Sequence, residues 1–337
     1  MGKCSYDAML RSMLRRLSFS VVTALLVLVG AELTLRGVYA QNELLFSWER
    51  PDGWMYFEET GILAMRPGTE DIGRDGEYVY TFRTNEQGLR EDDSVEVPKP
   101  SGQYRVLALG DSWMFGLNAT QGQTMPDVLE RTLPSALGVE SVEVVNAGVV
   151  GGCAFDMLRL WRRLGASLDV DAVLLSVPHN EGRQVDVDAQ RSDWYARAPT
   201  RARNHLRLYL AIRRATAFVS RPTYPELPKL DASVKDLVVL ISEARTAGLP
   251  VWTIAWPARL EESEDTAWLQ HVDWIEPLVD ADASVVGHLL QERGCWGEED
   301  TSHASESGYA ASAQLLTSVI AGDTVGDGSW YVAPRCR

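Results

Sequence analysis

The sequence predicts an α/β fold, a three-layer α/β/α sandwich in which helices cover both faces of a central parallel sheet. Two observations predict this fold. From residue 104 onward, short apolar segments alternate with longer amphipathic segments, the pattern of strands alternating with helices. The strand segments are continuous apolar runs, as expected of strands buried on both faces. The 337 residues are 45% apolar and 23% charged, so the chain is long enough and apolar enough to bury a sizeable core.

Each element of this alternation can be placed on the sequence. The expected strands are YRVLALG (104–110), SVEVVNAG (141–148), DAVLLSV (171–177) and LPVWTIAWP (249–257). The expected helices are MPDVLERTL (125–133), AFDMLRLWRRL (154–164), SVKDLVVLISEARTAG (233–248) and SHASESGYAASAQLLTSVI (302–320). We therefore expect the main domain over residues 104–322, with an insertion at 181–232 and a tail at 323–337.

A lead-in segment, residues 41–100, precedes the main domain and is expected to contain short strands. Within it, YVYTFRTN (78–85) alternates apolar and polar residues, which predicts a half-buried strand. The insertion contains RARNHLRLYLAIRR (201–214), a basic stretch with helical spacing in an acidic protein. We expect a solvated helix whose Leu206 and Leu210 pack inward. The alternative is a basic patch for an anionic substrate or the membrane surface.

The N-terminal segment has the charge and hydropathy of an export signal. Four basic residues in 1–16 precede an uncharged run of 15 residues, Leu17 to Ala31. Extension of this run to residue 36 makes it long enough to cross a membrane when tilted. We expect a cytoplasmic basic N-terminus, an uncleaved transmembrane anchor over 17–36 and an extracytoplasmic body. The alternative is a cleaved signal peptide, with small-residue cleavage sites after Ala31 and Ala40.

Composition excludes some partners. The formal net charge of −15 argues against a nucleic-acid surface, which would require a basic stripe. None of the five His has the spacing of a metal-ligand pair such as His-x-x-x-His, so we expect no metal and no cofactor.

Four cysteines fit an exported protein without requiring a disulfide. Cys4 would lie in the cytoplasm, which leaves Cys153, Cys295 and Cys336 outside. Three cysteines allow one disulfide, and Cys295 and Cys336, which flank the last expected helix, are the expected pair. The alternative is that all thiols are reduced and packed as small apolar side chains.

Polar side chains and glycines follow the strands of the predicted sheet, and two more polar residues precede its last helix. Because the carboxyl ends of parallel strands in an open sheet line one crevice, we expect these residues to lie close together. They are Asp111, Ser112, Asn146, Gly148, Gly151, Gly152, His179, Asn180, Glu181, Asp300 and His303.

This set contains the groups that acyl transfer from an ester requires. A nucleophilic hydroxyl such as that of Ser112 needs a base such as His303, and the base needs a carboxylate such as that of Asp300 to fix its tautomer. The tetrahedral oxyanion needs backbone N–H and amide donors. Ser112 also has a simpler interpretation as a helix cap, because a Ser hydroxyl accepts a backbone N–H from the first turn. The absence of a Gly-x-Ser-x-Gly motif from the sequence disfavours an α/β-hydrolase.

Four short motifs resemble those of the GDSL/SGNH hydrolase superfamily. LALGDSW (107–113) resembles the first, VVNAGVVGG (144–152) the second, LLSVPHNEG (174–182) the third, and DTSH (300–303) the Asp-x-x-His of the fourth. The resemblance implies the flavodoxin-like α/β/α fold of these hydrolases. It implies a catalytic triad of Ser112, Asp300 and His303, and an oxyanion hole formed by Ser112, Gly151 and Asn180.

The resemblance extends upstream and also has departures. TFRTNEQGLRED (81–92) resembles a lead-in of membrane-anchored bacterial members. In the third motif, Pro178 and Glu181 stand where the family usually has Gly and Asp, and Trp113 replaces the usual Leu of the first motif. The amide of Asn180 is retained, so activity is expected, while Pro178 alters the loop that carries this amide.

The resemblance implies a serine ester hydrolase, an acyl esterase or carbohydrate O-deacetylase, that acts through a seryl-acyl intermediate. Its substrate would be an acyl ester, with a glycan as one candidate alcohol component. The implied location is the bacterial inner membrane, with the catalytic domain in the periplasm, or the exterior after signal cleavage. Two alternatives remain: an O-acyltransferase that modifies a cell-envelope or exported polysaccharide with the same triad, and a non-catalytic glycan-binding relic.

Overall fold

The computed structural model describes residues 3–39, 53–58, 62–75, 78–177, 206–212, 228–255, 284–289, 303–322 and 331–332. These residues belong to two units. The smaller unit comprises Met1–Gly53 and Arg197–Thr223, and the larger comprises Trp54–Ala196 and Tyr224–Arg337.

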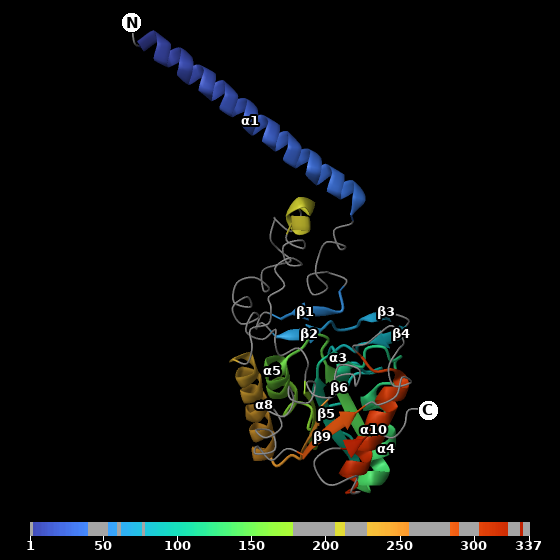
Figure 1. Cartoon of the computed structure of the whole chain (residues 1–337). Coiled ribbons are helices and arrows are strands. Elements are labelled where there is room, and N and C mark those ends of the chain that lie inside the picture. Colours follow the sequence, from blue (N-terminus) through green and yellow to red (C-terminus); the bar gives the residue numbers. More distant parts are fainter. Residues whose placement is uncertain are drawn as a thin grey trace. The chain divides into compact units, whose positions relative to one another are not determined.

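A six-stranded parallel sheet forms the middle layer of the larger unit (Figure 1). Its strands are β5 (Gln103–Gly110), β6 (Ser141–Gly148), β7 (Ala172–Val177), β8 (Val251–Ala255), β9 (Ser284–Leu289) and β10 (Tyr331–Val332). They lie in the order β10-β9-β8-β7-β5-β6, and every pair is parallel. If the strands of this sheet are numbered along the chain from β5 to β9, they follow the flavodoxin-like order 2-1-3-4-5. The predicted fold class is confirmed, although β9 and β10 were not among the predicted strands.

Helices cover both faces of this sheet. α4 (Met125–Leu137) packs beside α10 (Glu306–Ile320) on one face, and α5 (Ala154–Leu164) packs beside α8 (Pro228–Thr246) on the other (Figure 1). Thr124 caps the start of α4: its side chain accepts the Asp127 N–H, and the Asp127 carboxylate accepts the Thr124 N–H. Gly138 caps the end of the helix, with a φ of 66° in the left-handed region that Gly adopts without strain. These end signals explain why the helix occupies this stretch of sequence.

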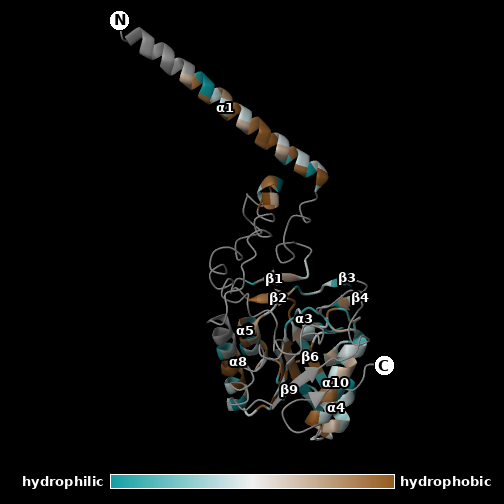
Figure 2. Ribbon diagram, viewed as in Figure 1, coloured by the Kyte–Doolittle hydropathy of each residue, from teal (hydrophilic) through white to brown (hydrophobic). Residues whose placement is uncertain are grey.

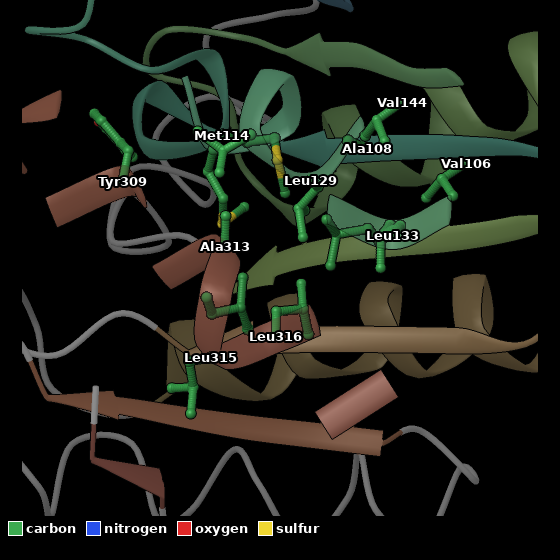
Figure 3. Packing of buried hydrophobic residues seen from close by; sticks show 14 of the residues in the cluster. Val106, Ala108, Met114, Leu129, Leu133, Val144, Tyr309, Ala313, Leu315 and Leu316 are labelled. Atoms are coloured by element: carbon green, nitrogen blue, oxygen red, sulfur yellow. The ribbon is translucent and has the colours of Figure 1, made fainter. Parts of the chain in front are cut away.

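The core on the α4/α10 face is built from side chains of both helices and of the strands that they cover (Figure 3). Leu129 of α4 and Leu316 of α10 are both 0% exposed, as are Val106 and Ala108 of β5. Burial of one Leu side chain contributes about 1.5–3 kcal/mol. The apolar periodicity of the two helices therefore fixes which of their faces rests on the sheet.

The lead-in of the larger unit contains two antiparallel strand pairs. β1 (Met55–Phe57) pairs with β2 (Leu63–Met65), and β3 (Glu70–Asp75) pairs with β4 (Tyr78–Arg83). In β4, Tyr80 and Phe82 are buried while Val79 is exposed, which is the alternation that predicts a strand here. The carboxylate of Asp156 in α5 accepts the Leu63 N–H at 3.0 Å, so the lead-in is bonded to a helix of the main sheet.

The smaller unit contains α1 (Lys3–Val38) and a short helix at 207–212. Met13–Val38 contains an 18-residue window with a mean hydropathy of 2.0 and is long and apolar enough to cross a membrane. A signal sequence would have the same properties (Figure 2). In the second segment, Leu210 is 0% exposed but Leu206 is 47% exposed. The expectation that both leucines pack inward is therefore right for Leu210 and wrong for Leu206.

Candidate active site

The structure assigns the helix cap at the end of β5 to Asp111, and Ser112 is the first residue of α3 (Ser112–Phe115). The Asp111 carboxylate accepts the Trp113 N–H at 3.0 Å. Because Asp111 satisfies this orphan donor of the first turn, the Ser112 hydroxyl is not needed as a cap.

The Ser112 hydroxyl instead lies next to an imidazole. Its Oγ is 2.8 Å from Nε2 of His303, a hydrogen-bond distance between side chains 191 positions apart in the sequence. Ser112 is 7% exposed and His303 is half-buried. A neutral imidazole at this distance can accept the hydroxyl proton, which is the arrangement that activates a serine nucleophile.

Two glycines allow α3 to approach the sheet. A Cβ on Gly110 would lie 2.4 Å from Cβ of Met114, and one on Gly148 would lie 2.2 Å from the backbone N of Phe115. The second contact is with backbone, so no side-chain rotation could relieve it. The Gly residues of GDS and NAG therefore set how closely the serine-bearing helix packs on the ends of β5 and β6.

A buried arginine from the lead-in holds the other end of α3. The guanidinium of Arg90 donates to the carbonyls of Phe115 and Gly116, each at 2.7 Å, and of Ala119, at 2.5 Å. It also lies 4.7 Å from the centroid of the Phe115 ring, a cation–π contact. Burial lowers the pKa of Arg90 to about 10, so the side chain stays charged at neutral pH. Arg90 thus binds carbonyls at the end of this four-residue helix and in the turn that follows it.

α10 contacts the segment that follows α3. The Tyr309 hydroxyl donates to the Leu117 carbonyl at 3.0 Å, and the Glu306 carboxylate accepts the Thr120 N–H at 3.0 Å. These bonds join α10, which follows His303, to the loop that follows α3.

The indole of Trp113 packs beside His303 and Tyr309. Its ring centroid lies 5.8 Å from that of His303 and 6.4 Å from that of Tyr309. Trp113 is 3% exposed, so its indole forms a buried apolar wall beside the imidazole.

The loop after β6 presents Gly151 in a tight turn. The Gly152 N–H donates to the Val149 carbonyl at 2.8 Å, and Gly151 has a φ of 76° at the third position of this turn. A positive φ at that position is the signature of a type II turn and explains a Gly there. Among the described residues, neither the Ser112 N–H nor the Gly151 N–H has an acceptor.

Asn146, which follows the apolar part of β6, has a structural place instead. It is 2% exposed, and its side-chain oxygen accepts the Gly148 N–H at 3.0 Å. Its backbone N–H donates to the buried carboxylate of Glu91 at 2.6 Å. Burial raises the pKa of Glu91 well above its usual value, and the Asn146 N–H opposes this rise. β6 is an edge strand, and these bonds occupy its outer side.

Cys153 is the N-cap residue of α5 and lies in a closed polar contact. Its thiol and its backbone N–H both donate to one carboxylate oxygen of Asp156, at 3.2 Å and 3.1 Å. A carboxylate beside the sulfur disfavours a negatively charged thiolate. The cysteine is 2% exposed, so the structure favours the packed, reduced interpretation for Cys153.

Several predicted residues lie outside the described part of the chain. These are Pro178, His179, Asn180, Glu181, Asp300, Cys295 and Cys336. Their predicted roles and the disulfide therefore stay predictions.

Reasoning from the sequence missed the contacts that support the site. Arg90 was noted only for a motif resemblance, and Glu306 and Tyr309 were not singled out. Arg90 stands in a polar stretch, NEQGLRED (85–92), so the composition around it gave no signal that its charge is buried.

No family model and no curated protein matches the sequence. Solved structures do match. The lipase/acylhydrolase from Enterococcus faecalis is 17% identical, with 65% of this chain and 96% of that chain covered and a TM-score of 0.42. The psychrotrophic esterase EstA from Pseudoalteromonas sp. is 13% identical over 65% and 94% of the two chains, with a TM-score of 0.40.

A third match is AlinE4, an SGNH-hydrolase family esterase, with 14% identity over 68% of this chain and 100% of that chain and a TM-score of 0.40. At these identities the likeness concerns the fold alone, so the function proposed below rests on the residues of this chain. The three solved structures are described as a lipase/acylhydrolase, an esterase and an SGNH-hydrolase family esterase, and they are what this chain is similar to.

Proposed function

We propose that the protein is a serine ester hydrolase that acts through a seryl-acyl intermediate, with Ser112 as nucleophile and His303 as base. The observation that carries this proposal is the 2.8 Å separation between Ser112 Oγ and His303 Nε2. The capping role of Asp111 supports it, because the Ser112 hydroxyl then has no structural task at the helix start.

In the first half-reaction, Ser112 Oγ attacks the ester carbonyl carbon while His303 Nε2 takes the hydroxyl proton. The carbonyl π electrons move to oxygen and give a tetrahedral oxyanion. As the intermediate collapses, the bond to the alcohol oxygen breaks, and the imidazolium of His303 donates its proton to that oxygen. Water then attacks the acyl carbonyl carbon while His303 takes its proton. The bond to Ser112 Oγ breaks as His303 returns that proton to the serine oxygen, which releases the acid and restores the enzyme.

The oxyanion requires donors that are in place before the reaction. We assign this task to the N–H groups of Ser112 and Gly151 and to the side-chain amide of Asn180. The first two are supported by their lack of acceptors in the described part of the chain. Asn180 is assigned from the resemblance of its motif alone.

The imidazole also requires an orienting group. We assign Asp300 as the acceptor of the Nδ1 proton of His303, which would leave Nε2 free to take the Ser112 proton. The spacing Asp-x-x-His supports this assignment. The extracytoplasmic location is proposed from the basic N-terminus and the apolar segment Met13–Val38.

The test is covalent labelling of the purified full-length protein with a fluorophosphonate, read by mass spectrometry of the digest. We expect the label on Ser112 and none in His303→Ala, because without the base the hydroxyl keeps its proton. Asp300→Asn should label more slowly, and Cys153→Ser is the control that labels as the parent does. A folded protein that hydrolyses no short-chain aryl ester and never labels on Ser112 would refute the proposal.

A further inference from the structure

We infer that the short helix 207–212 lies in the outer interface of the membrane, beside the end of α1, and that an anionic lipid surface is its partner. The inference rests on the proposed placement of α1 as a membrane span. It assigns a membrane contact to a segment that the sequence pattern alone favoured as a solvated helix.

The contact with α1 is made through one carboxylate. Glu32 accepts the N–H of Arg207 at 3.0 Å and of Leu208 at 2.8 Å, and it also pairs with Arg36 at 2.7 Å. The first N–H groups of a helix have no intrahelical partner, so Glu32 supplies the acceptor that starts helix 207–212. An acidic residue near the end of an apolar helix thereby gains a structural task.

The exposure pattern of α1 shows where this contact ends. Among residues 13–39, only Ala31, Glu32 and Leu35 are partly covered, and all the others are exposed. Leu35 lies four positions after Ala31 and three after Glu32, so the three residues lie on one side of the helix. The apolar run 17–31 therefore remains open, and lipid is the solvent that suits such a surface.

Helix geometry places Glu32 near a membrane boundary. The run from residue 17 to residue 32 rises roughly 22 Å at 1.5 Å per residue, against a hydrocarbon thickness of roughly 30 Å. If the basic N-terminal end marks one boundary, Glu32 approaches the other. Helix 207–212, which is bonded to Glu32, then lies at the depth of the headgroups and outer acyl carbons.

The side chains of this segment suit that depth. Leu206 is 47% exposed and Ile212 is 56% exposed, whereas Leu210 is 0% exposed and packs with Tyr209 and Ala211. Large apolar side chains exposed beside a membrane span are typical of interfacial helices. The segment thus has one covered apolar side chain and two that are exposed.

Charge supports the same partner. Residues 197–223 contain seven Arg and no Asp or Glu, whereas the chain as a whole carries −15. The structure describes residues 206–212 of this stretch, and these are bonded to α1. A basic segment of sequence is attracted to anionic headgroups, and the acidic remainder of the chain is repelled from them. The basic stretch also lies far along the chain from α1, so it does not oppose the topology that the N-terminal charges favour.

The test measures the depth of nitroxide labels on the full chain reconstituted in nanodiscs. The background carries Cys4→Ser, Cys295→Ser and Cys336→Ser and keeps the buried Cys153. Ile212→Cys reports on the segment, and Ile72→Cys, 51% exposed in β3, is the matched control. Accessibility to oxygen reports lipid, and accessibility to a water-soluble nickel chelate reports water.

We expect the label at 212 to be several-fold more accessible to oxygen, relative to the chelate, than the label at 72. Replacement of phosphatidylglycerol by phosphatidylcholine should raise the chelate accessibility at 212 and leave that at 72 unchanged. An Ile212 label as wet as the control, or closed to both reagents, would overturn the inference, and indifference to lipid charge would remove its anionic partner. A Leu25→Cys label separates these results from failure of the span itself, and ester turnover by the labelled chains reports separately on the proposed function.

Discussion

Two strand-to-helix junctions lie side by side at one edge of the sheet, and each carries a potential nucleophile. β5 ends at Gly110 and leads to Ser112, and β6 ends at Gly148 and leads to Cys153. The serine hydroxyl contacts the imidazole of His303. The cysteine thiol contacts a carboxylate of its own helix.

The difference between the junctions lies in which residue caps the helix. At the first, Asp111 is the cap, and the next side chain is released toward the opposite element. At the second, Cys153 is itself the cap residue, and Asp156 holds both its N–H and its thiol. The comparison teaches that a cap supplied by the preceding residue leaves the Ser112 hydroxyl to contact His303, whereas Cys153 is held within its own helix.

The largest expected effect comes from variants that remove the serine–histidine contact, and a variant of the cysteine junction is the control. Ser112→Ala and His303→Ala should each lower the turnover of an aryl ester by ~10⁴-fold or more, because nucleophile and base act as a unit. Cys153→Ala should leave turnover unchanged. Steady-state kinetics of the three purified variants test this, and a loss of turnover in Cys153→Ala alone would reverse the assignment of the two junctions.

The next largest effect concerns a proposed oxyanion donor that belongs to neither junction, the side-chain amide of Asn180. Asn180→Ala should lower kcat by ~10²–10³-fold with little change in KM, because one preorganised oxyanion donor is removed. Thermal unfolding of the variant serves as the control for folding. Undiminished turnover would mean that Pro178 has moved the amide away from the crevice and that the two N–H groups suffice.

A smaller effect tests the support of the serine junction. Arg90→Lys should lower the free energy of unfolding by about 3 kcal/mol, because an ammonium cannot reach the three carbonyls that the guanidinium spans. Arg83→Lys is the matched control, since its exposed pairs with Glu70 and Asp92 should contribute at most ~1 kcal/mol. Chemical denaturation measures both, and equal losses would argue against the clamp.

The smallest effect concerns the β6 side and depends on pH. Burial raises the pKa of Glu91, so the folded state binds a proton more tightly than the unfolded state does. The contribution of Glu91 to stability is therefore fully present below its ordinary pKa and is lost as pH rises through the raised one. Glu91→Gln should flatten the decline of Tm above pH 4.5, whereas the exposed Glu86→Gln should not. A decline of equal slope in Glu91→Gln and the parent would contradict this.

The sequence predicted the elements whose signals are local. β6 and α5 occupy the predicted residues, and α4 begins at the predicted Met125 because Thr124 and Pro126 mark its start. β9 was missed, since Gly287 and His288 interrupt its apolar run. Local pattern therefore found the elements with strong periodicity and clear caps.

The residues of the candidate site also divide into those that local pattern singles out and those that it does not. Ser112, Gly151 and His303 could be singled out as candidates because they stand beside recognisable ends of strands or helices. Arg90 could not be assigned a task, since its acceptors lie 25 to 29 positions later in the chain. Contacts across such distances are decided by the packing of whole elements, which spacing does not express.

The 191-residue separation of Ser112 and His303 has a consequence for biosynthesis. A ribosome adds about 5–20 residues per second, so the serine emerges at least roughly ten seconds before the histidine. Throughout that interval the nascent chain carries the proposed nucleophile without its proposed base. On the proposed mechanism the hydroxyl becomes reactive only after His303, which immediately precedes α10, has been made and has reached Ser112.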